Sequence, residues 1–82
     1  MATIEQMEAC ISDLRRLSRV SRLLPHGMVA SRLLVSKQRL SDLIQDSVIQ
    51  TESLDGCRLV VVASALRFAI KRYHRKLPKK IG

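Results

Sequence analysis

Aromatic rings and thiols are scarce in this chain of 82 residues. It has no Trp, one Phe (Phe68) and one Tyr (Tyr73), which nearly excludes a surface that stacks single-stranded bases on rings. Its two cysteines, Cys10 and Cys57, are too few and too far apart for a disulfide scaffold or a four-thiolate zinc site. We therefore expect free thiols, and we interpret both cysteines as small core residues rather than nucleophiles.

Long apolar runs are also missing. The longest, Leu59 to Ala63, is far shorter than the roughly 20 residues that a membrane span needs. The N-terminus carries Glu5 and Glu8 and lacks the basic, apolar and small-residue regions of a secretion signal. No repeat or low-complexity tract interrupts the chain. The sequence therefore predicts a single domain, residues 1–82, of a cytoplasmic protein without a membrane partner.

Acidic residues are few, and the charge is unevenly placed. The chain has 15 Lys and Arg against 7 Asp and Glu, which gives a net charge of +8. Hydrophobic residues make up 46% and charged ones 27%, a balance typical of a globular chain rather than a disordered one. Nearly all the basic charge falls in two stretches that contain no acid, residues 14–41 and 56–82. So large an excess on so small a body indicates a polyanionic partner.

The N-terminal segment, residues 1–24, has the periodicity of a helix. Thr3 followed by Gln6 is a capping-box start, and helical spacing predicts a helix from Ile4 to Leu23. Its apolar stripe comprises Ile4, Met7, Ile11, Leu14, Leu17 and Leu24. Pro25-His26-Gly27 ends the helix, because Pro cannot continue it and Gly frees the backbone.

Residues 27–46 admit two interpretations. They form either one long helix with an interrupted apolar stripe, or two short helices joined by a turn at Leu34-Val35-Ser36. We prefer two helices, because Ser36 then becomes an N-cap and the second helix gains a clean buried face. That face comprises Leu40, Leu43 and Ile44.

Residues 48–62 carry a strong hairpin signal. Asp55-Gly56 lies between two stretches rich in β-branched residues, and a type I′ turn needs positive φ at both central positions. Across this turn we expect three facing pairs, namely Leu54 with Cys57, Glu52 with Leu59, and Thr51 with Val60.

A final helix is predicted over residues 64–77, with Ser64 as its N-cap and Pro78 ending it. It buries Leu66, Ala69, Ile70 and Tyr73 and directs Arg67, Lys71 and Arg75 outward. A basic tail, residues 78–82, follows. The order is helix, two helices around a turn, hairpin and helix, so the fold class is mainly α with a small β-hairpin.

This order resembles a winged helix-turn-helix domain of the MerR and phage-excisionase type. The resemblance covers residues 27–72 and rests on VASRLLVSKQRLSDLI, residues 29–44, with apolar residues at the fixed positions of the motif and Ala30 where the helices cross. A hairpin followed by Ser-Ala-Leu and an amphipathic helix is also similar to that family. The resemblance implies a small sequence-specific regulator of double-stranded DNA, with no enzymatic activity and no cofactor.

A regulator of this type is a transcriptional repressor or an excisionase-like recombination directionality factor of a mobile element. Both roles imply a nucleoid-associated protein that works as a homodimer or oligomer on DNA, with a recombinase or polymerase as a possible further partner.

The second helix of such a unit enters the major groove. Its expected base contacts are the residues off its apolar stripe, Lys37, Gln38, Ser41, Asp42 and Gln45. Asp42 could instead pair with Arg39. Phosphate contacts are expected from Arg32, Ser36, Arg39, Arg58, Arg67 and Lys71.

Leu34 stands in the turn where this family usually carries Gly. Either its backbone is strained into the left-handed region, or a longer turn packs Leu34 inward; we expect packing, because exposing Leu beside Leu33 and Val35 is costly. The first helix has more apolar residues than a small core needs, so we expect it to mediate dimerisation. The alternative is that it caps the domain's own core.

Catalytic and metal-binding sets do not emerge from the sequence. His26 and His74 share no ligand spacing with each other or with a cysteine. The competing hypothesis is a basic, all-helical interaction protein. In that case a single helix over residues 28–50 would complete a three-helix bundle, which would bind structured RNA, an acidic protein or an anionic membrane.

Overall fold

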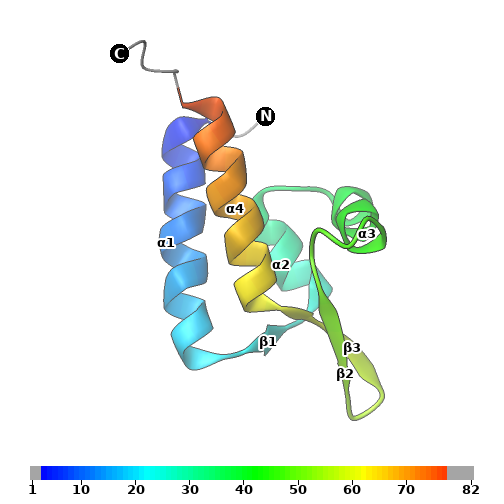
Figure 1. Cartoon of the computed structure of the whole chain (residues 1–82). Helices are drawn as coiled ribbons and strands as arrows, with labels where there is room; N and C mark the ends of the chain where they lie inside the picture. Colours follow the sequence, from blue (N-terminus) through cyan, green and yellow to red (C-terminus); the bar gives the residue numbers. More distant parts are fainter. Residues whose placement is uncertain (1–2, 78–82) are drawn as a thin grey trace.

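Helices make up most of the part of the chain that the computed structural model describes, residues 3–77 (Figure 1). The elements in order are α1 (Ile4–Val20), β1 (Leu23–Leu24), α2 (His26–Leu33), α3 (Lys37–Gln45), β2 (Thr51–Leu54), β3 (Cys57–Val61) and α4 (Val62–Lys76). The strands form one antiparallel sheet in the order β1-β3-β2. A mainly helical chain with a small hairpin is thereby confirmed, whereas the predicted basic tail, residues 78–82, lies outside the described residues.

The first helix starts as predicted but ends earlier. Thr3 and Gln6 form the capping box, with each backbone N–H donating to the other's side chain at 2.9 and 3.1 Å. The helix stops at Val20, and Leu23 and Leu24 form the short strand β1 instead of a last helical turn. They pair with Val61 and Val60 of β3. The predicted helix is therefore confirmed over Ile4–Val20, but its predicted end at Leu23 is wrong, because the backbone of Leu23 and Leu24 pairs with β3 instead.

Pro25 marks the start of α2 rather than a long break. The second helix begins at His26, directly after Pro25, and includes Gly27. The first N–H groups of a helix have no partner within the helix. Pro lacks a backbone N–H, so no hydrogen bond is lost when it stands at the start of a helix. The gap predicted over Pro25-His26-Gly27 is thus shorter than expected.

Residues 34–36 separate α2 from α3, which confirms the two-helix interpretation. The alternative of a single helix over residues 28–50, as part of a three-helix bundle, is therefore wrong. Ser36 caps α3, since its hydroxyl accepts a hydrogen bond from the N–H of Arg39 at 3.0 Å.

Leu34 does not pack inward as expected. It is 50% exposed and has φ 58° and ψ 43°, in the left-handed region. The end of α2 imposes this conformation: Val35 N–H donates to Ala30 O at 3.0 Å and Leu34 N–H to Ser31 O at 3.2 Å. These two bonds close the Schellman motif, which needs a left-handed residue at this position.

The predicted hairpin register is confirmed residue for residue. Thr51 pairs with Val60, Glu52 with Leu59, and Leu54 with Cys57. Asp55 and Gly56 at the turn have φ 51° and 79°, as a type I′ turn requires.

The last helix begins at Val62, two residues before the predicted cap at Ser64. Ser64 lies 2% exposed inside α4, and its hydroxyl donates to Val61 O at 2.7 Å and accepts from Gln50 N–H at 2.9 Å. The N-cap assignment of Ser64 is therefore wrong. Its hydroxyl instead fastens the segment that leads into β2 to the start of α4.

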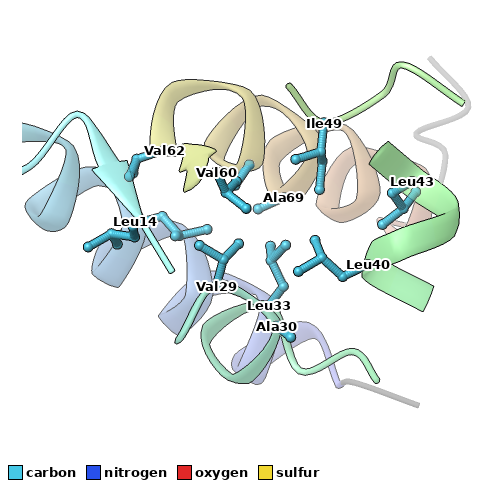
Figure 2. Packing of buried hydrophobic residues seen from close by; sticks show 12 residues of the cluster. Leu14, Val29, Ala30, Leu33, Leu40, Leu43, Ile49, Val60, Val62 and Ala69 are labelled. Atoms are coloured by element: carbon cyan, nitrogen blue, oxygen red, sulfur yellow. The ribbon is translucent and has the colours of Figure 1, made fainter. Parts of the chain in front are cut away.

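Every helix and the central strand contribute to one aliphatic core (Figure 2). α1 and α4 lie side by side and antiparallel along one flank, with the start of α1 and the end of α4 at the same pole (Figure 1). α1 supplies Leu14, which is fully buried, and Cys10, which is 4% exposed. The first helix thus caps the domain's own core. Cys57, expected in the core, is exposed on the hairpin.

Candidate nucleic-acid interface

The outward face of α3 carries the five predicted base-contact residues. Leu40 and Leu43 turn toward α2 and the core, at 1% and 3% exposure, so the opposite side of this helix faces solvent (Figure 2). On it lie Lys37, Gln38, Ser41, Asp42 and Gln45. All but Asp42, which is half-buried, are exposed. The apolar stripe of α3 therefore does what the sequence predicts and directs a polar face away from the domain.

Asp42 pairs with Gln38 rather than with Arg39. The Gln38 amide nitrogen donates to Asp42 Oδ1 at 3.1 Å, one helical turn along the same side of α3. The alternative in which Asp42 pairs with Arg39 is therefore wrong, and Arg39 is exposed to solvent. An amide four residues before a carboxylate is a visible sequence signal, and it identifies this contact.

The N-terminus of α3 is an exposed, positively polarised end. The Ser36 hydroxyl already accepts from Arg39 N–H, so it is engaged within its own helix. The preceding N–H groups, of Lys37 and Gln38, have no backbone acceptor within the helix. Together with the Lys37 ammonium they can receive a phosphate oxygen.

Three cations from other elements lie near the opposite, C-terminal end of α3. Arg58 of β3 lines a hollow with Ile44 and Ser47. Arg67 and Lys71 of α4 line a second hollow, in which Ser47 also takes part. All three cations are exposed, and none forms an ion pair within residues 3–77. Hairpin and C-terminal helix thus bring predicted phosphate contacts to both sides of the connection that follows α3.

Arg32 is placed apart from this group. Its Nη1 atom lies 3.5 Å from Asp13 Oδ2, and Asp13 also pairs with Arg16 at 2.8 Å. Arg32 is therefore drawn toward α1 and away from the outward face of α3.

An ion pair that the sequence did not indicate ties the hairpin to the segment before β1. The Arg22 guanidinium contacts both Glu52 oxygens, with Nη2 at 2.8 Å from Oε1. The hydrogen bond from Arg22 lowers the pKa of Glu52, and the same bond raises the pKa of Arg22. Thirty residues separate the partners, so only the folded sheet brings them together.

The two cysteines differ in exposure, with Cys10 buried and Cys57 exposed. Burial raises the pKa of the Cys10 thiol, although the positive charge of Arg72 acts in the opposite direction. In this part of the chain, no three His, Cys, Asp or Glu side chains gather to hold a metal ion. None of the described helices is both long and apolar enough to cross a bilayer.

No family model matches the chain, and neither a curated protein nor a solved structure shows significant similarity to it.

Proposed function

We propose that this chain is a small sequence-specific regulator that binds double-stranded DNA as a winged helix-turn-helix module. In this assignment α2 and α3 are the helix-turn-helix, α3 is the recognition helix, and the β2–β3 hairpin is the wing. One observation carries the proposal: α3 presents a polar face to solvent while its other side is anchored in the core, and the exposed Arg58 of the hairpin lies near its C-terminal end.

Direct readout follows from the side chains on that face. The major groove, about 12 Å wide, admits one helix. Lys37 suits the O6 and N7 atoms of guanine, Gln38 suits adenine, and Asp42 can accept from a cytosine amine. Lys37 and Gln38 lie in the first turn of α3, the part of a recognition helix that reaches base edges.

Phosphate contacts follow from the cations around α3. Arg39 lies on the helix itself, Arg58 on the wing, and Arg67 and Lys71 on α4. These side chains are exposed and free of ion pairs in the described part of the chain, so they can approach the DNA backbone without first breaking internal contacts. We assign Arg32 a lesser role, because Asp13 already partners it.

A module with one recognition helix covers few base pairs, so regulators of this size bind as dimers or arrays. We therefore propose a homodimer on DNA. Its biological role would be that of a repressor or of a recombination directionality factor in a mobile element, associated with the nucleoid. A recombinase or polymerase would be the protein partner in those roles.

Selection of sites from a random pool of duplex DNA by the purified full chain tests this function. We expect one sequence to be enriched. Gln38→Ala should change the enriched bases, whereas Lys71→Ala should weaken all sequences about equally, since the first residue meets base edges and the second only phosphate. Enrichment of no sequence, or tighter binding to duplex RNA than to DNA, would contradict the proposal.

A further inference from the structure

α1 and α4 lie side by side along one flank (Figure 1). A shallow hollow on this flank has both apolar and polar lining, and its polar side chains are Glu8, Ser12, Arg15 and His74. Ile11 of α1 and Ile70 and Tyr73 of α4 line it, and all three are only half-buried. Its volume of about 260 Å³ is below the roughly 300–1,000 Å³ of small-molecule pockets. A hollow of this size between two helices suits a side chain that another helix inserts.

Two opposite charges flank Ile11 along the same hollow. Glu8 lies three residues before it and Arg15 four residues after it, and both line the hollow. Seven residues of helix separate Glu8 from Arg15 by about 10 Å, too far for an ion pair within one chain. Neither has an ion-pair partner within residues 3–77.

The rest of α1 has the same polarity. Glu5 lies in the first turn with Glu8 just after it, whereas Arg15, Arg16 and Arg19 occupy the C-terminal half. All five side chains are exposed. The outward surface of α1 is therefore acidic at one end and basic at the other, and it complements itself when two copies run in opposite directions.

We propose that a second copy of this chain docks here, with the two α1 helices antiparallel and a two-fold axis passing between Ile11 and Ser12. Glu8 of each copy then faces Arg15 of the other, and the symmetry forms this pair twice. Each Ile11 lies at the centre and enters the hollow of the other copy. The hydrophobic contact and the two ion pairs form one self-complementary interface.

The charge pattern favours a second copy in this orientation over other occupants. A parallel arrangement would place Glu8 against Glu8 and Arg15 against Arg15. An acidic partner would repel Glu8, and a basic one would repel Arg15. This association needs no DNA, so it stands or falls separately from the proposed readout by α3.

Charge-swap variants of the full chain test the interface in the absence of DNA. We expect the protein to self-associate in sedimentation equilibrium, with the dissociation constant raised at least about tenfold by Glu8→Arg or by Arg15→Glu, since each places two like-charge pairs at the interface. The double variant, Glu8→Arg with Arg15→Glu, restores opposite charges and should associate like the original chain. An equimolar mixture of the two single variants should also associate.

Asp46→Arg is the matched control. It makes the same change of charge as Glu8→Arg, but at an exposed residue that directly follows α3, on the side of the domain away from α1. It should therefore leave association unchanged. Circular dichroism of each variant verifies that helix content is retained. The proposal is overturned by a monomer at the highest attainable concentration, by single variants that associate like the original chain, or by a double variant that stays dissociated.

Discussion

Leu34 holds a backbone conformation that aliphatic residues rarely adopt. Its φ of 58° lies in the left-handed region, where the Cβ atom crowds the following carbonyl. Half of the residue is exposed, so burial offsets little of this strain. The connection between α2 and α3 therefore has both hydrogen bonds of the Schellman motif but holds Leu34 in a strained conformation.

Leu34→Gly should stabilise the protein by about 0.5–1 kcal/mol. Relief of a left-handed strain of about 1–2 kcal/mol exceeds the loss of partial burial and the greater freedom of the unfolded chain. Urea unfolding of both proteins measures the difference. Leu54→Gly is the matched control, since Leu54 is 52% exposed but lies in a strand, and it should destabilise. Equal losses of stability for both variants would show that strain at Leu34 is unimportant.

Asp42 acts on the proposed DNA contact through Gln38. The hydrogen bond at 3.1 Å fixes the Gln38 amide and leaves its oxygen and one N–H for a base. Asp42→Ala should therefore bind non-specific duplex more tightly, because a negative charge is lost, yet discriminate less between the selected site and others.

Asp46→Ala removes the same charge just beyond α3 without touching Gln38. It should raise non-specific affinity while leaving the specificity ratio unchanged. Competition binding with selected and scrambled duplexes measures both quantities. Identical behaviour of the two variants would rule out a positioning role for Asp42.

At the scale of elements, the sequence predicted correctly those features that depend on residues close together in the chain. Asp55-Gly56 set the hairpin register, and Ser36 set the start of α3. Strand β1 was missed because its two residues continue a helical periodicity and become a strand only by pairing with β3. The α4 start was misplaced because Ser64 resembles a cap, whereas its hydroxyl bonds a distant backbone N–H.

The Arg22–Glu52 pair makes the attachment of β2 dependent on pH. Its hydrogen bond holds the pKa of Glu52 below the usual 4.5, so on acidification the unfolded chain takes up this proton first. The contribution of the pair to stability is therefore complete above that value and is lost as the pH falls through the folded-state pKa. Glu52→Gln should lower the melting temperature slightly at neutral pH, and the difference should vanish in acid.

Thermal unfolding of the original chain and of Glu52→Gln, measured from about pH 7 to about pH 3, should show their melting temperatures becoming equal in acid. In an Arg22→Met background, Glu52→Gln should have no comparable pH-dependent effect, because the partner is gone. A melting difference that persists unchanged into acid would contradict the assignment.

At the scale of the whole molecule, the sequence pattern predicts some parts of the candidate interface and helix packing determines others. The apolar stripe of α3 was sufficient to predict its outward polar face. The sequence pattern could not indicate that Arg32 turns to Asp13, or that Arg67 and Lys71 share a hollow with the connection after α3, because both depend on how helices pack.

Salt should control affinity for duplex DNA. If about 6–8 phosphates are neutralised, affinity should fall by about 10³-fold or more between about 50 and 200 mM salt, because condensed counterions are released on binding. Titration of a labelled duplex at several salt concentrations gives the slope. Arg58→Ala should lower that slope by about one, whereas Ser41→Ala should not change it. Affinity independent of salt would argue against phosphate contacts.

Pairing with β1 makes the base of the hairpin differ from its tip in how readily its hydrogen bonds open. β1 pairs only with Val60 and Val61, so the base of β3 is held on both edges, while Leu54 and Cys57 at the tip are held on one and are exposed. Amide hydrogens near the tip should therefore exchange through local opening, and those at the base only when the whole domain unfolds. In the proposed complex, the tip of the hairpin would adjust to the DNA surface, while its base would stay fixed against β1 and the core.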